Sequence, residues 1–62
     1  MSVQEFLEEI SPDQSVKLYY ETEEDRCIFD GYAGEIIEQN FFTSFEVTGH
    51  AYNGAEMLIW VK

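Results

Sequence analysis

The chain has 62 residues, of which 13 are acidic and 3 are basic, so its formal net charge is −10. A chain of this length predicts one compact domain over residues 1–62, with little room for a catalytic cleft, and we do not expect an enzyme. The acidic excess argues against direct binding to nucleic acid or to anionic membranes. With 45% hydrophobic residues, the chain is too apolar for an acidic disordered tail.

The cysteine content and the first residues bear on the location of the protein. A single cysteine, Cys27, excludes an intramolecular disulfide and favours a reducing compartment. The first ten residues include three glutamates and no basic residue, unlike a signal peptide. We therefore expect a cytoplasmic protein.

An amphipathic helix is predicted at the start of the chain. Ser2 and Glu5 have the spacing of a capping box, in which each side chain accepts a hydrogen bond from the backbone of the other residue. One apolar stripe follows at helical spacing, formed by Val3, Phe6, Leu7 and Ile10. Because Pro12 disfavours helical geometry at the residue before it, the helix should end after about nine residues.

Two strands are predicted in the first half of the chain. Ser15 to Thr22 alternates between apolar and polar residues, which is typical of a half-buried strand. A charged turn at residues 23–25 leads into a second strand from Arg26 to Phe29. Asp30-Gly31 then indicates a bend or a bulge.

The second half of the chain predicts a helical turn and two more strands. Glu35 to Gln39 can form one turn of helix that ends at Asn40 in a left-handed conformation. Alternation resumes from Thr43 to Thr48, and an apolar strand runs from Ala55 to Val61. The order of elements predicts an α+β fold, with the N-terminal helix packed on a four-stranded antiparallel sheet.

The last hairpin leaves two possible arrangements. Asn53-Gly54 favours a two-residue turn, which would pair Tyr52 with Ala55. Leu58 and Trp60 would then share one face of the sheet, whereas the alternate residues Met57, Ile59 and Val61 would share the other. Either a bulge at Gly49 changes the register, or the sheet is apolar on both faces and needs a partner or a second copy of the chain.

The sequence shows no arrangement of residues that supports catalysis or cofactor binding. His50 is the single histidine, and we expect a surface position for it, without a zinc site. Cys27 is expected to be a small buried residue, because one neighbouring arginine is weak support for a reactive thiolate. Gly31 and Gly34 lack the longer glycine pattern and the lysine of a phosphate-binding loop. We expect no metal and no cofactor.

The acidic residues are concentrated in the first half of the chain. Residues 1–31 hold nine acidic and two basic residues, and Glu5 and Glu9 repel each other at a spacing of one helical turn. An acidic face can steer a protein onto a basic surface, and a tyrosine beside carboxylates suits a protein interface. The predicted partner-binding residues are Glu5, Glu8, Glu9, Asp13, Tyr19, Glu21, Glu23, Glu24, Asp25 and Asp30.

Four segments are spread over most of the chain: VQEFLEEISPD at residues 3–13, VKLYY at 16–20, FDGYAGEI at 29–36 and FTSFEV at 42–47. In these segments the sequence resembles small acidic proteins of phages and prophages of Gram-positive bacteria. Similar phage proteins include anti-CRISPR and other anti-defence inhibitors, some of which mimic nucleic acid. The segment at residues 50–54 departs from this pattern.

Two functions are expected from these observations. The first is a non-catalytic inhibitor of phage type, similar to anti-CRISPR proteins, which occupies a basic nucleic-acid-binding site on a host protein such as a CRISPR effector. The alternative is a homodimerising structural or ligand-sequestering domain that uses the apolar face of the C-terminal hairpin.

Overall fold

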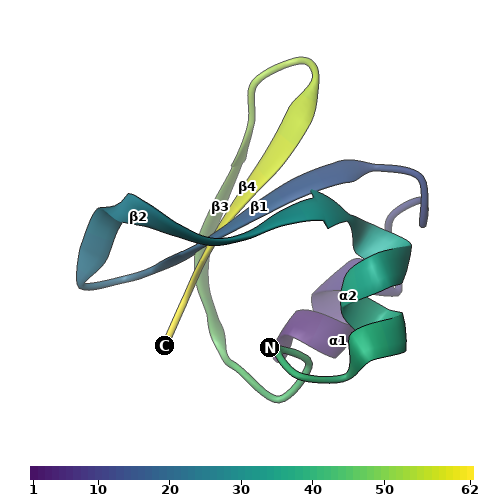
Figure 1. Cartoon of the computed structure of the whole chain (residues 1–62), viewed down its shortest axis with the longest axis horizontal. Coiled ribbons are helices and arrows are strands. Elements are labelled where there is room, and N and C mark those ends of the chain that lie inside the picture. The colour runs from purple at the N-terminus through teal and green to yellow at the C-terminus, as the bar shows by residue number, and fades with distance from the viewer.

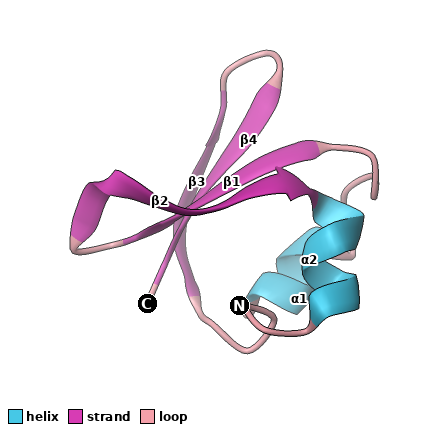
Figure 2. Ribbon diagram, in the orientation of Figure 1, coloured by secondary structure: helices cyan, strands magenta, loops and turns pink.

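The fold combines two helices with a four-stranded sheet. The computed structural model describes residues 1–62, with the side chain of Glu24 left out. The elements, in chain order, are α1 (Val3–Leu7), β1 (Ser15–Tyr20), β2 (Glu23–Tyr32), α2 (Ala33–Gln39), β3 (Val47–Tyr52) and β4 (Glu56–Val61). Both helices lie on the same side of the twisted sheet (Figures 1 and 2). Neither helix in the described chain has the length and apolar character that a membrane crossing requires.

The sheet is mixed, so the predicted α+β class is confirmed and the purely antiparallel arrangement is wrong. The strand order is β2-β1-β4-β3, and both hairpins are antiparallel as expected. The two central strands, β1 and β4, run parallel. Alternation within a strand shows which residues face the core, but it does not show which strand of one hairpin lies beside the other. The two strands with fully buried residues take the central positions.

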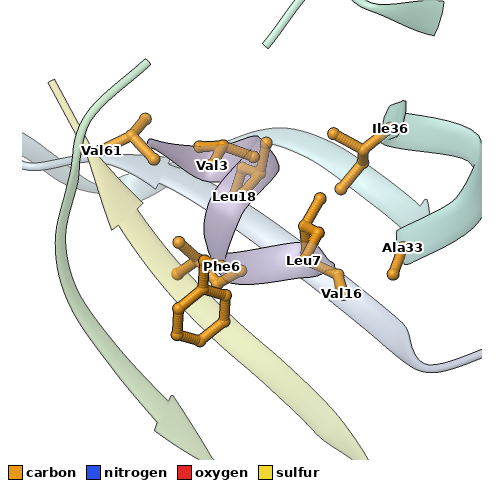
Figure 3. Packing of buried hydrophobic residues seen from close by; sticks show 9 residues of the cluster. Val3, Phe6, Leu7, Val16, Leu18, Ala33, Ile36 and Val61 are labelled. Carbon is orange, nitrogen blue, oxygen red and sulfur yellow. The ribbon is translucent and has the colours of Figure 1, made fainter. Parts of the chain in front are cut away.

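The core lies between the sheet and the two helices (Figure 3). Each central strand contributes two fully buried residues, Val16 and Leu18 from β1 and Ile59 and Val61 from β4. The helices cover them with Val3, Phe6, Leu7, Ala33 and Ile36. Of the two adjacent phenylalanines, Phe42 packs against this core and Phe41 is exposed. The predicted apolar stripe of the first helix therefore faces the sheet.

The first helix is shorter than predicted. The capping box is confirmed: Ser2 Oγ accepts a hydrogen bond from the Glu5 N–H (3.2 Å), and Glu5 Oε1 accepts one from the Ser2 N–H (3.0 Å). The helix ends at Leu7, because Glu9 and Ile10 donate to carbonyls three residues earlier, as in a tighter turn. Ile10 still packs against the core.

The first hairpin differs from the prediction at its turn. Residues 23–25 belong to β2, and the turn lies at residues 21–22. No irregularity occurs at Asp30 or Gly31, which pair regularly with Lys17 and Val16. The register shifts instead between Leu18 and Tyr20. These two residues pair with Phe29 and Glu23, so this part of β2 contains extra residues that have no partner in β1.

The second helix confirms the expected helical turn. It extends over Ala33–Gln39 and ends at Asn40, whose φ of 56° is left-handed. The N–H of Gly34 donates to the Pro12 carbonyl (3.0 Å), and a Cβ added to Gly34 would lie 3.2 Å from the Pro12 Cβ. This close approach joins α2 to the segment after α1. Of the two glycines at positions 31 and 34, Gly34 thus allows close packing against Pro12.

The third strand begins later than predicted, at Val47 in place of Thr43. Residues 43–45 form the connection after α2, and their carbonyls at Thr43 and Phe45 accept hydrogen bonds from the start of α1. Ser2 and Glu46 also form an isolated antiparallel bridge. Local alternation at residues 43–48 did not reveal that this segment pairs with the N-terminus.

The register of the last hairpin combines features of both predicted arrangements. Tyr52 pairs with Met57, and not with Ala55, because the Asn53 side chain accepts hydrogen bonds from the Ala55 and Glu56 N–H groups (3.0 and 2.7 Å). Gly54, with a φ of 95°, is thus the first of two central turn residues.

The predicted bulge is confirmed next to Gly49. Val47 pairs with Val61 and Gly49 pairs with Trp60, so Thr48 is the extra residue. The bulge brings Val47 to the helix side of the sheet, where it packs against the core. Leu58 and Trp60 nevertheless lie on the opposite side, so both faces of the sheet carry apolar residues.

Candidate functional site

The two helices and the segment that follows α1 carry ionisable side chains that are all acidic. This helical layer comprises residues 3–13 and 33–39, and its ionisable side chains are Glu5, Glu8, Glu9, Asp13, Glu35 and Glu38. All six are exposed. The basic residues of the chain, at positions 17, 26 and 62, all lie outside it. α1 and α2 lie side by side (Figure 1), so acidic side chains are present on both neighbouring helices of this layer.

Two carboxylates of this layer are held in place by the helix starts. Hydrogen bonds from the Ser2 backbone N–H and hydroxyl lower the pKa of the Glu5 carboxyl below its ordinary value. In α2, Glu35 Oε1 accepts a hydrogen bond from the Tyr32 N–H at 3.3 Å. Glu8 and Glu38 have no such role, which makes them suitable for substitution.

The basic side chains already have acidic partners outside the helical layer. Lys17 pairs with Glu56 at 3.7 Å, Arg26 with Glu23 at 3.5 Å, and Lys62 with Glu46 at 3.3 Å. No ion pair in the described chain includes a carboxylate of the helical layer. The acidic surface is therefore available to cations from another molecule.

The remaining predicted site residues lie elsewhere. Glu21 lies in the turn between β1 and β2, and Glu23 and Asp25 lie at the start of β2. All three are exposed, at the opposite end of the molecule from the helices in Figure 1. Glu24 was also predicted to bind a partner, but its side chain lies outside the described residues. The structure thus divides the predicted acidic site into two separate surfaces.

Tyr19 and Asp30 lie on neither acidic surface but on the open face, the side of the sheet opposite the helices. Tyr19 stacks on Trp60, with ring centroids 5.9 Å apart, beside Lys17 and Leu58. The nearby Glu56 carboxylate, followed by Asp30, raises the pKa of Lys17 above its ordinary value. The Trp60 indole N–H is buried there, and no described residue accepts a hydrogen bond from it.

A groove of about 410 Å³ lies between α1 and β3. Its apolar side chains come from Met1, Phe6 and Val47, and Glu9 of the helical layer lies at the same groove. His50 packs on the Phe6 ring, with centroids 4.9 Å apart and planes tilted by 51°. Figure 3 shows Phe6 on the part of α1 beside β3 and β4. The groove is therefore an apolar site next to the acidic layer.

His50 and Cys27 lie on the strands at the two opposite edges of the sheet. His50 is exposed, as expected for a surface histidine. Cys27, which was expected to be buried, is exposed in β2, and its thiol donates to the Phe29 carbonyl at 3.0 Å. The reason is that Cys27 pairs with Tyr19 on the open face. Among the described residues, no three His, Cys, Asp or Glu side chains are grouped to hold a metal ion.

Sequence reasoning missed Glu35 and Glu38 as members of the acidic surface. Both were assigned to a helical turn but were not connected with the acidic residues of the first helix, which are distant in sequence. A usable signal was present, since the chain has no lysine or arginine between residues 27 and 61.

The comparisons with known proteins assign no family. Protein-family models, curated proteins and solved structures were compared with the chain, and no match was found in any of the three.

Proposed function

We propose that the protein is a non-catalytic binding protein whose helical layer docks on a basic surface of another protein. One observation carries this proposal: six exposed carboxylates lie on two adjacent helices and the segment after α1, and none is neutralised by an ion pair within the described chain. Charge of one sign on a folded surface accelerates and orients association with a surface of opposite sign.

The partner is proposed to be a protein that binds nucleic acid at the contacted surface. Such proteins neutralise phosphates with lysine and arginine, and an array of carboxylates can occupy the same groups. The resemblance to small acidic phage proteins adds a finer proposal, in which the partner is a bacterial host protein such as a CRISPR effector and the protein inhibits it in the host cytoplasm.

Charge reversal on the helical layer tests this proposal. The double variant Glu8→Lys/Glu38→Lys changes two exposed carboxylates that have no capping role. In a pull-down from a Gram-positive host lysate, the wild type should retain nucleic-acid-binding proteins that added nucleic acid releases. The double variant should lose them, and higher salt should weaken the wild-type complex.

A matched control variant shows whether binding depends on the position of the substituted carboxylates or on the net charge of the protein. Glu21→Lys/Asp25→Lys makes the same change in net charge at the β1–β2 turn and the adjoining start of β2, and it should leave the retained proteins unchanged. The proposal fails if both double variants behave alike, or if nucleic acid does not release the retained proteins.

A second candidate function is homodimerisation through the open face. The specific observation in its favour is the apolar patch formed by Tyr19, Leu58 and Trp60, which no helix covers in the described structure. Sedimentation of the purified protein tests it. A dimer that Leu58→Glu converts to a folded monomer would support this function, and a wild-type monomer at high concentration would exclude it.

A further inference from the structure

The two edges of the sheet differ in their protection against pairing with another strand. The β2 edge carries Glu23, Asp25, Arg26 and Asp30, and charged residues discourage the addition of a further strand. The β3 edge, with the sequence VTGHAY, has no charged residue and no proline. Its one protective feature is the bulge at Thr48, near the start of the strand.

The backbone of β3 offers hydrogen bonds at this edge. Asn53 N–H donates to the Glu56 carbonyl (3.1 Å), and Glu46 and Lys62 exchange two hydrogen bonds (3.2 and 3.0 Å). Because bonded and non-bonded pairs alternate along an antiparallel ladder, Ala51 is bonded to β4, whereas His50 and Tyr52 direct their N–H and C=O groups away from it.

The start of the chain already uses part of this edge. Val47 donates its N–H to the Met1 carbonyl at 2.8 Å, and Ser2 forms an antiparallel bridge with Glu46. Beyond Val47, no described segment pairs with the outer side of β3. The backbone groups of His50 and Tyr52 that face outward are thus on the same edge of β3 that Met1 already pairs with at Val47.

The groove between α1 and β3 meets this stretch at His50, which is one of its lining residues. A strand added at His50 and Tyr52 would place alternate side chains on the helix side of the sheet, next to Met1, Phe6 and Val47. The Glu9 carboxylate at the groove would meet the neighbouring side chains of that strand. A strand with an apolar side chain beside a lysine or arginine would fill the apolar groove and also pair with the Glu9 carboxylate.

We propose that β3 binds an extended segment of the partner protein by strand addition, and that this segment carries an apolar residue flanked by Lys or Arg. The inference rests on the proposed function, because the acidic layer next to the groove selects a basic segment. A second copy of the chain is the less favourable occupant, since it brings a further net charge of −10 to the same edge.

Selection from a library of random peptides on the immobilised full-length protein tests this inference. The enriched peptides should contain an apolar residue next to Lys or Arg. They should bind Tyr52→Pro about tenfold or more weakly than Tyr52→Ala, because proline removes the N–H that faces the edge whereas alanine retains it. Both variants lack the tyrosine ring, so they form a matched pair.

A second measurement applies whether or not Tyr52→Pro folds. An enriched peptide, methylated at alternate backbone nitrogens, should lose about tenfold or more in affinity for the wild type while its charge is unchanged. In the wild-type complex with the unmodified peptide, the amides of His50 and Tyr52 should become protected from hydrogen exchange.

Several results would overturn the inference: no enrichment, enriched peptides without Lys or Arg, or equal binding by the methylated and unmodified peptides. A dimer in sedimentation that Tyr52→Pro disrupts and Tyr52→Ala does not would also overturn it, since a second copy would then occupy β3. A third outcome concerns basic peptides that bind Tyr52→Pro and Tyr52→Ala with equal affinity but bind Glu8→Lys/Glu38→Lys more weakly than the wild type. This outcome would overturn strand addition and would not contradict the proposed function. Failure of the proposed function itself is detected separately, in the lysate pull-down.

Discussion

Individual carboxylates of the helical layer have different local roles. Glu5 and Glu35 each accept a hydrogen bond from the backbone N–H three residues earlier, at the start of a short helix. A negative side chain at this position also interacts favourably with the helix dipole. Glu8 and Glu38 lie away from these starts and have no capping role. Glu5 and Glu35 therefore have a local structural contact that Glu8 and Glu38 lack.

The capping interaction predicts a specific pH dependence of stability. Because the folded-state pKa of Glu5 is lowered, its contribution is present above the pKa of the unfolded chain and is lost as the pH falls through the lowered folded-state pKa. Urea unfolding at a series of acidic pH values should show a smaller loss of stability for Glu5→Gln than for the wild type. Glu8→Gln, which removes an uncapped carboxylate, should not reproduce this difference.

The Ser2 side chain can be tested independently. Ser2→Ala should lower the free energy of unfolding by about 1 kcal/mol, the usual contribution of a side-chain N-cap. The pKa of Glu5, measured by NMR titration, should rise only part of the way to its ordinary value, because the Ser2 backbone N–H still donates to the carboxylate. An unchanged stability together with an unchanged pKa would show that the capping box is not formed in solution.

At the scale of elements, β4 shows how one strand serves both faces of the sheet. Ile59 and Val61 are fully buried under the helices, while Leu58 and Trp60 alternate with them on the open face. The sequence predicted the alternation within the strands, both helices and the positions of three of the four strands. The third strand was misplaced because Thr43–Phe45 alternates locally but bonds to the start of α1.

Neighbouring residues of β4 should differ in their importance for stability. Ile59→Ala removes a fully buried side chain and should cost about 2–5 kcal/mol. A chain of this size is expected to have a total stability of about 3–9 kcal/mol, so this loss should remove a large share of the total. Leu58→Ala, on the partly exposed open face, should cost less than about 2 kcal/mol.

Urea titration followed by circular dichroism distinguishes the two variants. Equal losses of stability would mean that the open face is as well packed as the core, which would require a second copy or another partner to cover Leu58. Sedimentation under the same conditions would identify such a second copy.

At the scale of the whole molecule, charge is distributed unequally. The basic residues lie on the sheet strands and at the C-terminus, each paired with a glutamate, while the helical layer is acidic throughout. Exposed ion pairs contribute little to stability, typically about 0–1 kcal/mol each. We therefore expect repulsion among the remaining carboxylates to dominate the response of the folded state to salt.

Added salt should stabilise this protein. Raising the ionic strength from about 0.01 M to about 0.15 M shortens the screening length from about 30 Å to about 8 Å, which weakens repulsion within the helical layer. A gain of about 1 kcal/mol would raise the Tm by about 4–8 °C in a chain of this size. Differential scanning calorimetry measures the change, and Glu8→Gln/Glu38→Gln should show a smaller rise. A Tm that falls with salt would mean that the ion pairs outweigh the repulsion.

The sequence by itself determined the local features of this protein: the capping box, the left-handed end of the second helix, the buried alternation of the strands and the excess of acidic charge. Each depends on residues a few positions apart, where the chemistry of side chains and backbone acts directly. Tertiary structure decided which strands became neighbours, that β1 and β4 run parallel, and that α2, which carries Glu35 and Glu38, lies beside α1. It also left the β3 edge open beside an apolar groove. These features depend on how distant segments share one small core, and local patterns of residues do not encode that arrangement.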